Sequence, residues 1–87
     1  MNIVKIKYLG EYQYQCWFKN GEVRIMDMKK FLKSSHHYLI KKYLDKELFA
    51  QAYIDHGAIA WGDNEMDINP MSILNNEFAP KKALKVQ

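Results

Sequence analysis

Length, composition and charge place narrow limits on this chain. Its 87 residues, with a mass of 10.3 kDa, can build one hydrophobic core but not two. Apolar residues make up 48% and charged residues 26% of the chain, which excludes a disordered polypeptide. No apolar stretch approaches the length of about 18 residues that a membrane span needs, and we expect no secretory signal, because lysines interrupt the apolar residues of segment 1–10. We therefore expect one cytoplasmic domain. The single cysteine, Cys16, agrees, because it can form no disulfide within the chain.

The net charge of +3 hides three blocks of opposite sign. Residues 1–46 carry ten Lys or Arg and four Asp or Glu, a net charge of +6, whereas residues 47–80 carry six acidic residues and no basic one, a net charge of −6. Lys81, Lys82 and Lys85 add +3 at the end of the chain. The first two blocks either lie side by side and neutralise each other or face a charged partner.

The first quarter of the chain has the pattern of β-strands. Val4, Ile6 and Tyr8 alternate with lysines, and residues 12–18 alternate apolar and polar side chains in the same way. A three-residue loop over residues 9–11, with Gly10 in the left-handed conformation, would join the two strands with their apolar faces aligned. We expect Val4, Ile6 and Tyr8 to face the core.

A second hairpin is predicted at Asn20-Gly21, because both residue types tolerate the positive φ that a two-residue type I′ turn requires. The register of this turn would place Trp17 opposite Arg24 on the outer face. We expect a cation–π contact between these two side chains.

From residue 27 to about residue 50 the apolar pattern becomes that of short helices. Asp27 is placed to cap the first of them, which runs through Leu32. Ser34 or Ser35 is placed to cap a second helix, and Asp45 a third.

The last third of the chain returns to strands. Residues 51–55 and 58–61 read as a hairpin around His56-Gly57, and Met66–Ile68 as a short strand. Pro70 is suited to open a final helical turn.

The order of these elements, βββ-αα-ββ, predicts the α+β class. We expect an antiparallel sheet of about five strands with the helices packed on one face. Residues 1–79 would form the domain, and residues 80–87 a basic, frayed tail.

The residue types that usually support catalysis or metal binding are scattered. His36 and His37 are adjacent and point about 100° apart on a helix, so they cannot chelate one ion from one face. Cys16 lies on an apolar strand face, where a thiol behaves as a small hydrophobic group. We expect no metal, no cofactor and no enzymatic activity.

Two surfaces are candidates for binding. A protein partner could dock on a free strand edge or on the face of Trp17 and Arg24, which are residue types common in binding hot spots, with help from the acidic residues Asp63 and Glu65. A lysine-rich helical face could instead contact nucleic acid, although lysine binds phosphate without reading bases, so such binding would be weak. This alternative site consists of Lys29, Lys30, Lys33, Lys41 and Lys42.

Read from end to end, the chain resembles the small bacterial family called domain of unknown function 2442. The resembling segments, in order, are residues 18–24, 26–28, 48–49 and 59–70. The resemblance implies a β-rich α+β domain, found alone or fused to a helix-turn-helix, that is often encoded beside a small toxin-like partner. It implies no catalytic residue.

The resemblance also implies structural roles for several residues. Gly21, beside Asn20, would serve the turn, Asp27 the cap, and Trp61 the core, while Asp67 and Pro70 would fix the last loop. Our leading hypothesis is a non-catalytic protein-binding module, the antitoxin-like or regulatory member of a two-protein system, whose partner is encoded by a neighbouring gene. Open sheet edges also leave room for a homo-oligomer.

Overall fold

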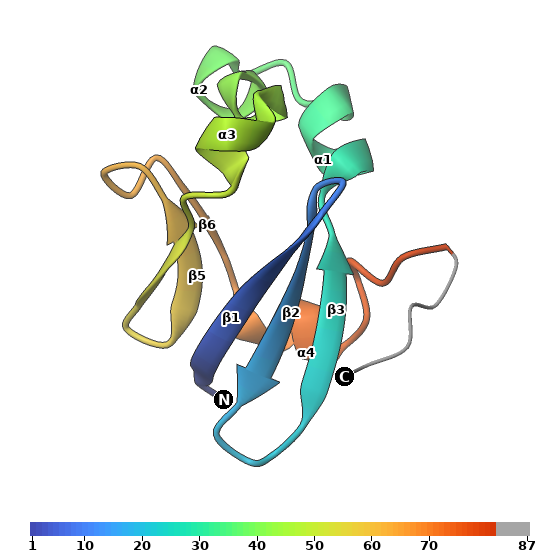
Figure 1. Ribbon diagram of the computed structural model, residues 1–87, viewed down its shortest axis with the longest axis vertical. Coiled ribbons are helices and arrows are strands. Elements are labelled where there is room, and N and C mark those ends of the chain that lie inside the picture. The colour runs from blue at the N-terminus through green and yellow to red at the C-terminus, as the bar shows by residue number, and fades with distance from the viewer. Residues whose placement is uncertain (82–87) are drawn as a thin grey trace.

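The computed structural model describes residues 1–81 and contains two antiparallel sheets, with short helices gathered at one end of them, at the top of the view, and the last helix behind the strands of the first sheet (Figure 1). One sheet has the order β1-β2-β3 and the other β4-β5-β6. The elements are β1 (Ile3–Gly10), β2 (Gln13–Phe18), β3 (Val23–Asp27), α1 (Lys29–Ser34), α2 (Tyr38–Lys41), the 3-10 helix η1 (Lys42–Leu44), α3 (Lys46–Phe49), β4 (Tyr53–Asp55), β5 (Ala58–Trp61), β6 (Met66–Ile68) and α4 (Pro70–Leu74).

The α+β class is confirmed, but the single sheet of about five strands is wrong. β1 and β4 lie close together, and the main-chain N–H of Ile3 donates to the carbonyl of Gly57 at 2.8 Å. Within residues 1–81 no ladder continues from β1 into β4, so the strands divide into two sheets of three. Local alternation predicts strands well, but it does not say which strand edges will pair.

The first hairpin turns more tightly than expected. Gly10 is left-handed, with φ +87°, but it belongs to β1, and Glu11 and Tyr12 alone form the loop with φ +49° and +63°. Positive φ is unfavourable for a bulky residue. Tertiary contacts hold Tyr12 there, because its hydroxyl donates to the carbonyl of Leu44 and its ring meets Phe49 edge to face at 5.7 Å.

An irregularity near the start of β1 changes which side chains face inward. The pairing with β2 shifts between Ile3 and Lys5. Ile3 is therefore buried, whereas Val4 is 57% exposed. The expectation that Val4 faces the core is wrong, because one extra residue in a strand reverses the alternation beyond it.

The register of the second hairpin differs by one residue from the expected one. Trp17 pairs with Val23, not with Arg24, because the loop comprises residues 19–21 and closes through Gly21 at φ +89°. This is a three-residue loop with a glycine bulge instead of a two-residue type I′ turn. Trp17 and Arg24 consequently lie on opposite faces of the sheet.

Of the expected helix caps, the one at Asp45 is confirmed, because its carboxylate accepts the N–H groups of Glu47 and Leu48 at 2.9 and 3.3 Å. At α1 the cap position belongs to Met28, whose side chain makes no cap bond, but the carboxylate of Asp27, one residue earlier, accepts the N–H of Lys29 at 2.9 Å. Both acceptors satisfy donors that the first turn of a helix leaves without partners.

The expected serine cap of α2 is wrong. His37 occupies the cap position, and its Nδ1 accepts the N–H of Leu39 at 3.2 Å. Ser35 supports this arrangement, since its hydroxyl accepts the N–H of His37 at 3.1 Å. Histidine serves because its neutral ring carries an acceptor nitrogen.

The hairpin of β4 and β5 and the last helix agree with the sequence pattern. Ile54 pairs with Ile59 across the expected turn, in which His56 and Gly57 both have positive φ. Pro70 begins α4, and the side chain of Asn69 caps it by accepting the N–H of Met71 at 2.9 Å.

The final loop is held differently from the arrangement that the resemblance implied. Asp67 is exposed in β6, and its side chain makes no hydrogen bond or ion pair among residues 1–81. The cap of Asn69 and the ring of Pro70 fix this loop instead.

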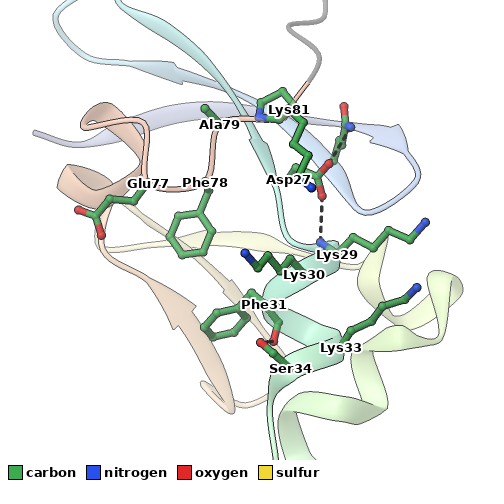
Figure 2. A pocket seen from close by; sticks show the side chains of 12 residues that line it. Asp27, Lys29, Lys30, Phe31, Lys33, Ser34, Glu77, Phe78, Ala79 and Lys81 are labelled. Carbon is green, nitrogen blue, oxygen red and sulfur yellow. Dashed lines mark hydrogen bonds between the residues drawn. The ribbon is translucent and has the colours of Figure 1, made fainter.

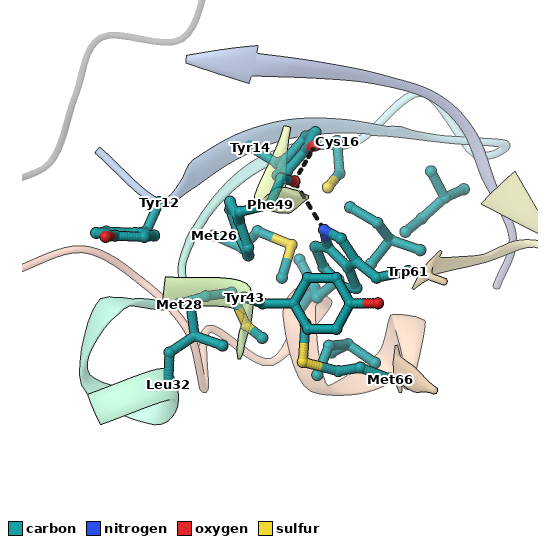
Figure 3. Close-up of a cluster of buried hydrophobic side chains, with 14 of the residues drawn as sticks. Tyr12, Tyr14, Cys16, Met26, Met28, Leu32, Tyr43, Phe49, Trp61 and Met66 are labelled. Carbon is teal, nitrogen blue, oxygen red and sulfur yellow. Dashed lines mark hydrogen bonds between the residues drawn. The ribbon is translucent and has the colours of Figure 1, made fainter. Parts of the chain in front are cut away.

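The core lies where β2, α3 and β5 converge (Figure 3). Trp61 is fully buried, as predicted, and stacks on Phe49 with ring centroids 5.1 Å apart. The carbonyl of Phe49, at the end of α3, accepts Trp61 Nε1–H at 2.8 Å and the Tyr14 hydroxyl at 2.7 Å. Helix ends leave carbonyls without helical partners, so these two aromatic donors complete the helix while they fill the core.

The end of the described chain adds to the fold. Pro80 and Lys81 lie beside α1, and the rest of the expected tail, residues 82–87, lies outside the described residues.

Within residues 1–81, no helix combines the length and the hydropathy that crossing a membrane would require.

Candidate functional site

A groove of about 950 Å³ lies between α1 and the segment that follows α4 (Figure 2). One wall is α1, and the other is the segment 77–81. The residues that line it are Gln13, Asp27, Lys29, Lys30, Phe31, Lys33, Ser34, Glu77, Phe78, Ala79, Pro80 and Lys81.

The groove exists because the chain reverses after α4 and is fastened to the end of β3. Asn76 takes φ +62°, and the N–H of Glu77 donates to the carbonyl of Ser72 at 3.0 Å. The N–H of Asp27 then donates to the carbonyl of Phe78 at 2.7 Å. This bond satisfies an outward N–H at the end of an edge strand and holds the second wall beside α1.

The polarity of α1 determines what the groove displays. Leu32 is fully buried and anchors the inner face of the helix. Phe31 comes one residue earlier, about 100° around the helix, and is therefore 37% exposed. Its ring meets that of Phe78 edge to face, with centroids 5.9 Å apart. The groove thus has an aromatic pair across its two walls.

Four lysines line the groove, but they do not all lie beside the aromatic pair (Figure 2). Lys29 and Lys33 extend to the same side of α1, while Lys30 lies next to the two rings (Figure 2). Lys81 comes from the opposite wall. None of these four lysines forms an ion pair within the described part of the chain.

Two carboxylates also line the groove, but they differ in availability. Asp27 uses both of its oxygens, one for the N–H of Lys29 and the other for Gln13 Nε2 at 3.0 Å. Glu77 is exposed and lies beyond Phe78, on the side away from the lysines (Figure 2). The surface around α1 therefore remains positive.

The comparison with family models assigns the chain to a family. The model described as "Protein of unknown function (DUF2442)" matches residues 3–79. The chain belongs to this family. No curated protein and no solved structure matches the chain. The match covers both sheets and all the helices, including most of the groove, and the family description names no activity.

In this DUF2442 chain the expected pair of Trp17 and Arg24 does not form. Lys5 Nζ lies 4.7 Å from the centroid of the Trp17 ring and takes the position expected of the arginine. Arg24 pairs with Glu22 at 3.1 Å on the other face of the sheet. The one-residue change of register is the physical reason.

The two acidic residues expected to help in binding have different surroundings. Glu65 accepts a hydrogen bond from Lys42 Nζ at 2.7 Å and another from the Tyr43 hydroxyl at 2.6 Å. These two donors hold the pKa of Glu65 below its ordinary value, while burial, followed by the bond to Glu65, raises the pKa of Tyr43 to about 12. Asp63 is exposed in the same turn and is free of such contacts within the described chain.

The ion pairs show how far the basic block of residues 1–46 and the acidic block of residues 47–80 neutralise each other. The Lys42–Glu65 pair is the informative one. It joins the basic block to the acidic block, whereas the pairs Lys46–Glu11 and Arg24–Glu22 lie inside the basic block. Among the described residues, most lysines of the basic block therefore remain without acidic partners.

The five lysines of the alternative site divide into two groups. Lys29, Lys30 and Lys33 line the groove. Lys42 is engaged with Glu65, and Lys41 is exposed on α2, outside the groove.

Sequence reasoning missed the aromatic pair and Lys81. A signal for Phe31 was present, because a six-residue helix can bury only one of the neighbours Phe31 and Leu32. Phe78 and Lys81 had no such signal, since their place beside α1 depends on a contact across about 50 residues.

The thiol of Cys16, a group that can act as a nucleophile or a metal ligand, lies inside the core. Cys16 is fully buried, and desolvation raises the pKa of its thiol to about 12, so it is a poor nucleophile and a poor metal ligand. Residues 1–81 also contain no group of three or more His, Cys, Asp or Glu side chains that could hold a metal ion.

Proposed function

We propose that this chain is a non-catalytic protein-binding module, the antitoxin-like or regulatory member of a two-protein system in the cytoplasm. The observation that carries the proposal is the groove between α1 and the segment 77–81. It offers an aromatic pair, the exposed Phe31 and the partly buried Phe78, with charged side chains around it. An apolar anchor site within a polar rim is the usual anatomy of a protein interface.

The same lysines make nucleic acid the competing ligand, and the groove favours protein for two reasons. Arg24 is the chain's one arginine, and it lies outside the groove and pairs with Glu22. Arginine is the residue that most often reads bases. Glu77 also lines the groove, and it would repel a backbone that carries a charge on every nucleotide. A protein segment can place a neutral residue at that point.

The test is complex formation with the product of the neighbouring gene. We expect co-expression to give a complex of defined stoichiometry in sedimentation, and titration calorimetry to give an affinity that weakens less than about tenfold between about 50 and 200 mM salt. Phe31→Ala should weaken the complex by about tenfold or more, since anchor residues dominate interface energies. Trp17→Ala is the matched control, because it removes another partly exposed aromatic ring on a different surface.

Each other outcome has a definite meaning. No complex, together with nucleic-acid binding that falls by several orders of magnitude over the same salt range, would replace this proposal with the nucleic-acid alternative. A chain that forms only homodimers at all concentrations would also contradict it. Loss of the complex with Trp17→Ala but not with Phe31→Ala would keep the module and move its interface to the first sheet.

A further inference from the structure

The groove has a charge pattern that specifies the chemistry of its partner. Lys29, Lys30, Lys33 and Lys81 outnumber the two carboxylates of the lining, and one of those, Asp27, has both oxygens occupied by groups of this chain. Lysines gathered in this way repel one another unless an acidic group lies between them. Their complement is a ligand that carries carboxylates.

The spacing of the lysines fits an extended chain. Lys29 and Lys33 are four residues apart in α1, which is about 6 Å along the helix axis. Residues two apart in an extended peptide point to the same side and lie about 6.7 Å from each other. Two acidic residues separated by one residue would therefore each reach one lysine.

The aromatic pair supplies the second part of the recognition. Phe31 remains exposed, and its ring is already fixed by Phe78, so little side-chain freedom is lost when a ligand covers it. Lys30 lies next to the rings and can meet a further carboxylate or cover an inserted apolar side chain with its aliphatic stem (Figure 2).

We propose that this groove binds an extended acidic segment of a partner protein, with two Asp or Glu residues separated by one residue and a large apolar side chain a few residues farther along. This inference rests on the proposed function and adds the chemistry of the partner to it. The acidic pair lies over Lys29 and Lys33 on one flank of α1, and the segment crosses the helix over Lys30, so that the apolar side chain lies on Phe31 on the opposite flank (Figure 2).

The test uses a displayed library of short random peptides, selected on the full chain. The selected peptides should carry the acidic pair and a Phe, Leu, Trp or Tyr a few residues away from it. For a synthetic peptide of the selected sequence, fluorescence polarisation should show binding that is weakened about tenfold or more by the double variant Lys29→Glu and Lys33→Glu. Phe31→Ala should weaken the same peptide by a similar factor.

The matched control is the double variant Lys19→Glu and Lys41→Glu. It makes the same change in net charge at two exposed lysines outside the groove, and should alter the affinity by less than about twofold. Circular dichroism checks that both double variants are folded. Equal weakening by the two double variants would mean general charge attraction and would overturn the inference. Selected peptides without acidic residues, or selective binding of an oligonucleotide in the groove, would overturn it as well.

The inference and the proposed function can fail separately. A complex with the product of the neighbouring gene that ignores Lys29→Glu and Lys33→Glu would overturn the acidic segment and leave the module intact. Groove-dependent peptide binding without any such complex would support the groove chemistry and contradict the two-protein system.

Discussion

Removing the hydroxyl oxygen should destabilise the protein at Tyr14 but not at Tyr8. The two rings are neighbours in the core, with centroids 5.1 Å apart. The Tyr14 hydroxyl donates to the carbonyl of Phe49 at 2.7 Å and accepts the N–H of Ala52 at 3.2 Å. The Tyr8 hydroxyl is buried and has no hydrogen-bond partner among the described residues.

The magnitudes follow from which groups lose their partners. In Tyr14→Phe the carbonyl of Phe49 keeps its bond from Trp61, so the cost falls mainly on the N–H of Ala52. We expect a loss of about 1 to 2 kcal/mol in the free energy of unfolding, the range for a broken hydrogen bond that leaves a partly buried donor. Tyr8→Phe removes a hydroxyl that lost its hydrogen bonds to water when it was buried and that has gained none from the described residues. It should be neutral or stabilising by up to about 1 kcal/mol.

The assay is urea unfolding followed by tryptophan fluorescence, with the buried Trp61 as the main reporter. In both variants the free energy of unfolding should fall with urea concentration at the same rate as in the wild type. The urea midpoint should be lower than the wild-type value for Tyr14→Phe and equal to it or higher for Tyr8→Phe. In thermal unfolding, a change of about 1 kcal/mol should move the melting temperature by about 4 to 8 °C in a domain of this size. The reasoning would be refuted if Tyr8→Phe destabilised the protein as much as Tyr14→Phe, because the Tyr8 hydroxyl would then have a partner.

Three further predictions concern a carboxylate, the thiol and two glycines. The pKa of Glu65 is lowered in the folded state by Lys42 and Tyr43, so its stabilising effect is present above the ordinary value of 4.5 and is lost as the pH falls through the lowered pKa. Glu65→Gln should therefore reduce the acid dependence of the urea midpoint, and an unchanged dependence would contradict the pair. Cys16 should not react with a thiol reagent at about pH 8 until denaturant is added, because it is buried and its pKa is raised to about 12; rapid labelling of the folded protein would show that the core opens there. Gly57→Ala should destabilise more than Gly21→Ala by thermal unfolding. Both have positive φ, at a cost of about 1 kcal/mol, but only at Gly57 would a Cβ collide with the Asn2 side chain, and equal losses would argue against that close approach.

The sequence by itself determined the local structure of this protein. Residue types that tolerate positive φ indicated the turns at Gly21 and Gly57, where the structure has it. Asp45 and Pro70 indicated the starts of two helices. The α+β class followed from the order of strand-like and helix-like apolar patterns along the chain. It also indicated the family, which the match over residues 3–79 confirms. These features depend on neighbours along the chain, so the residues that cause them are adjacent in the sequence.

Part of the candidate site was visible in the same way. Lys29, Lys30 and Lys33 share one short segment, and the sequence grouped them as a charged face. Their aromatic companion Phe78 was not visible, because it reaches α1 only through the bond between its carbonyl and Asp27. The predicted contact between Trp17 and Arg24 was wrong for a local reason. A hairpin loop longer by one residue was enough to put the two side chains on opposite faces of the sheet.

The tertiary structure alone decided the division into two sheets and the place of the groove. Each of these depends on competition between alternatives of similar local energy. Such alternatives are separated by contacts between distant residues, such as the bonds from Tyr14 and Trp61 to the carbonyl of Phe49. A pattern along the chain cannot show these contacts, because they form only when the whole core closes.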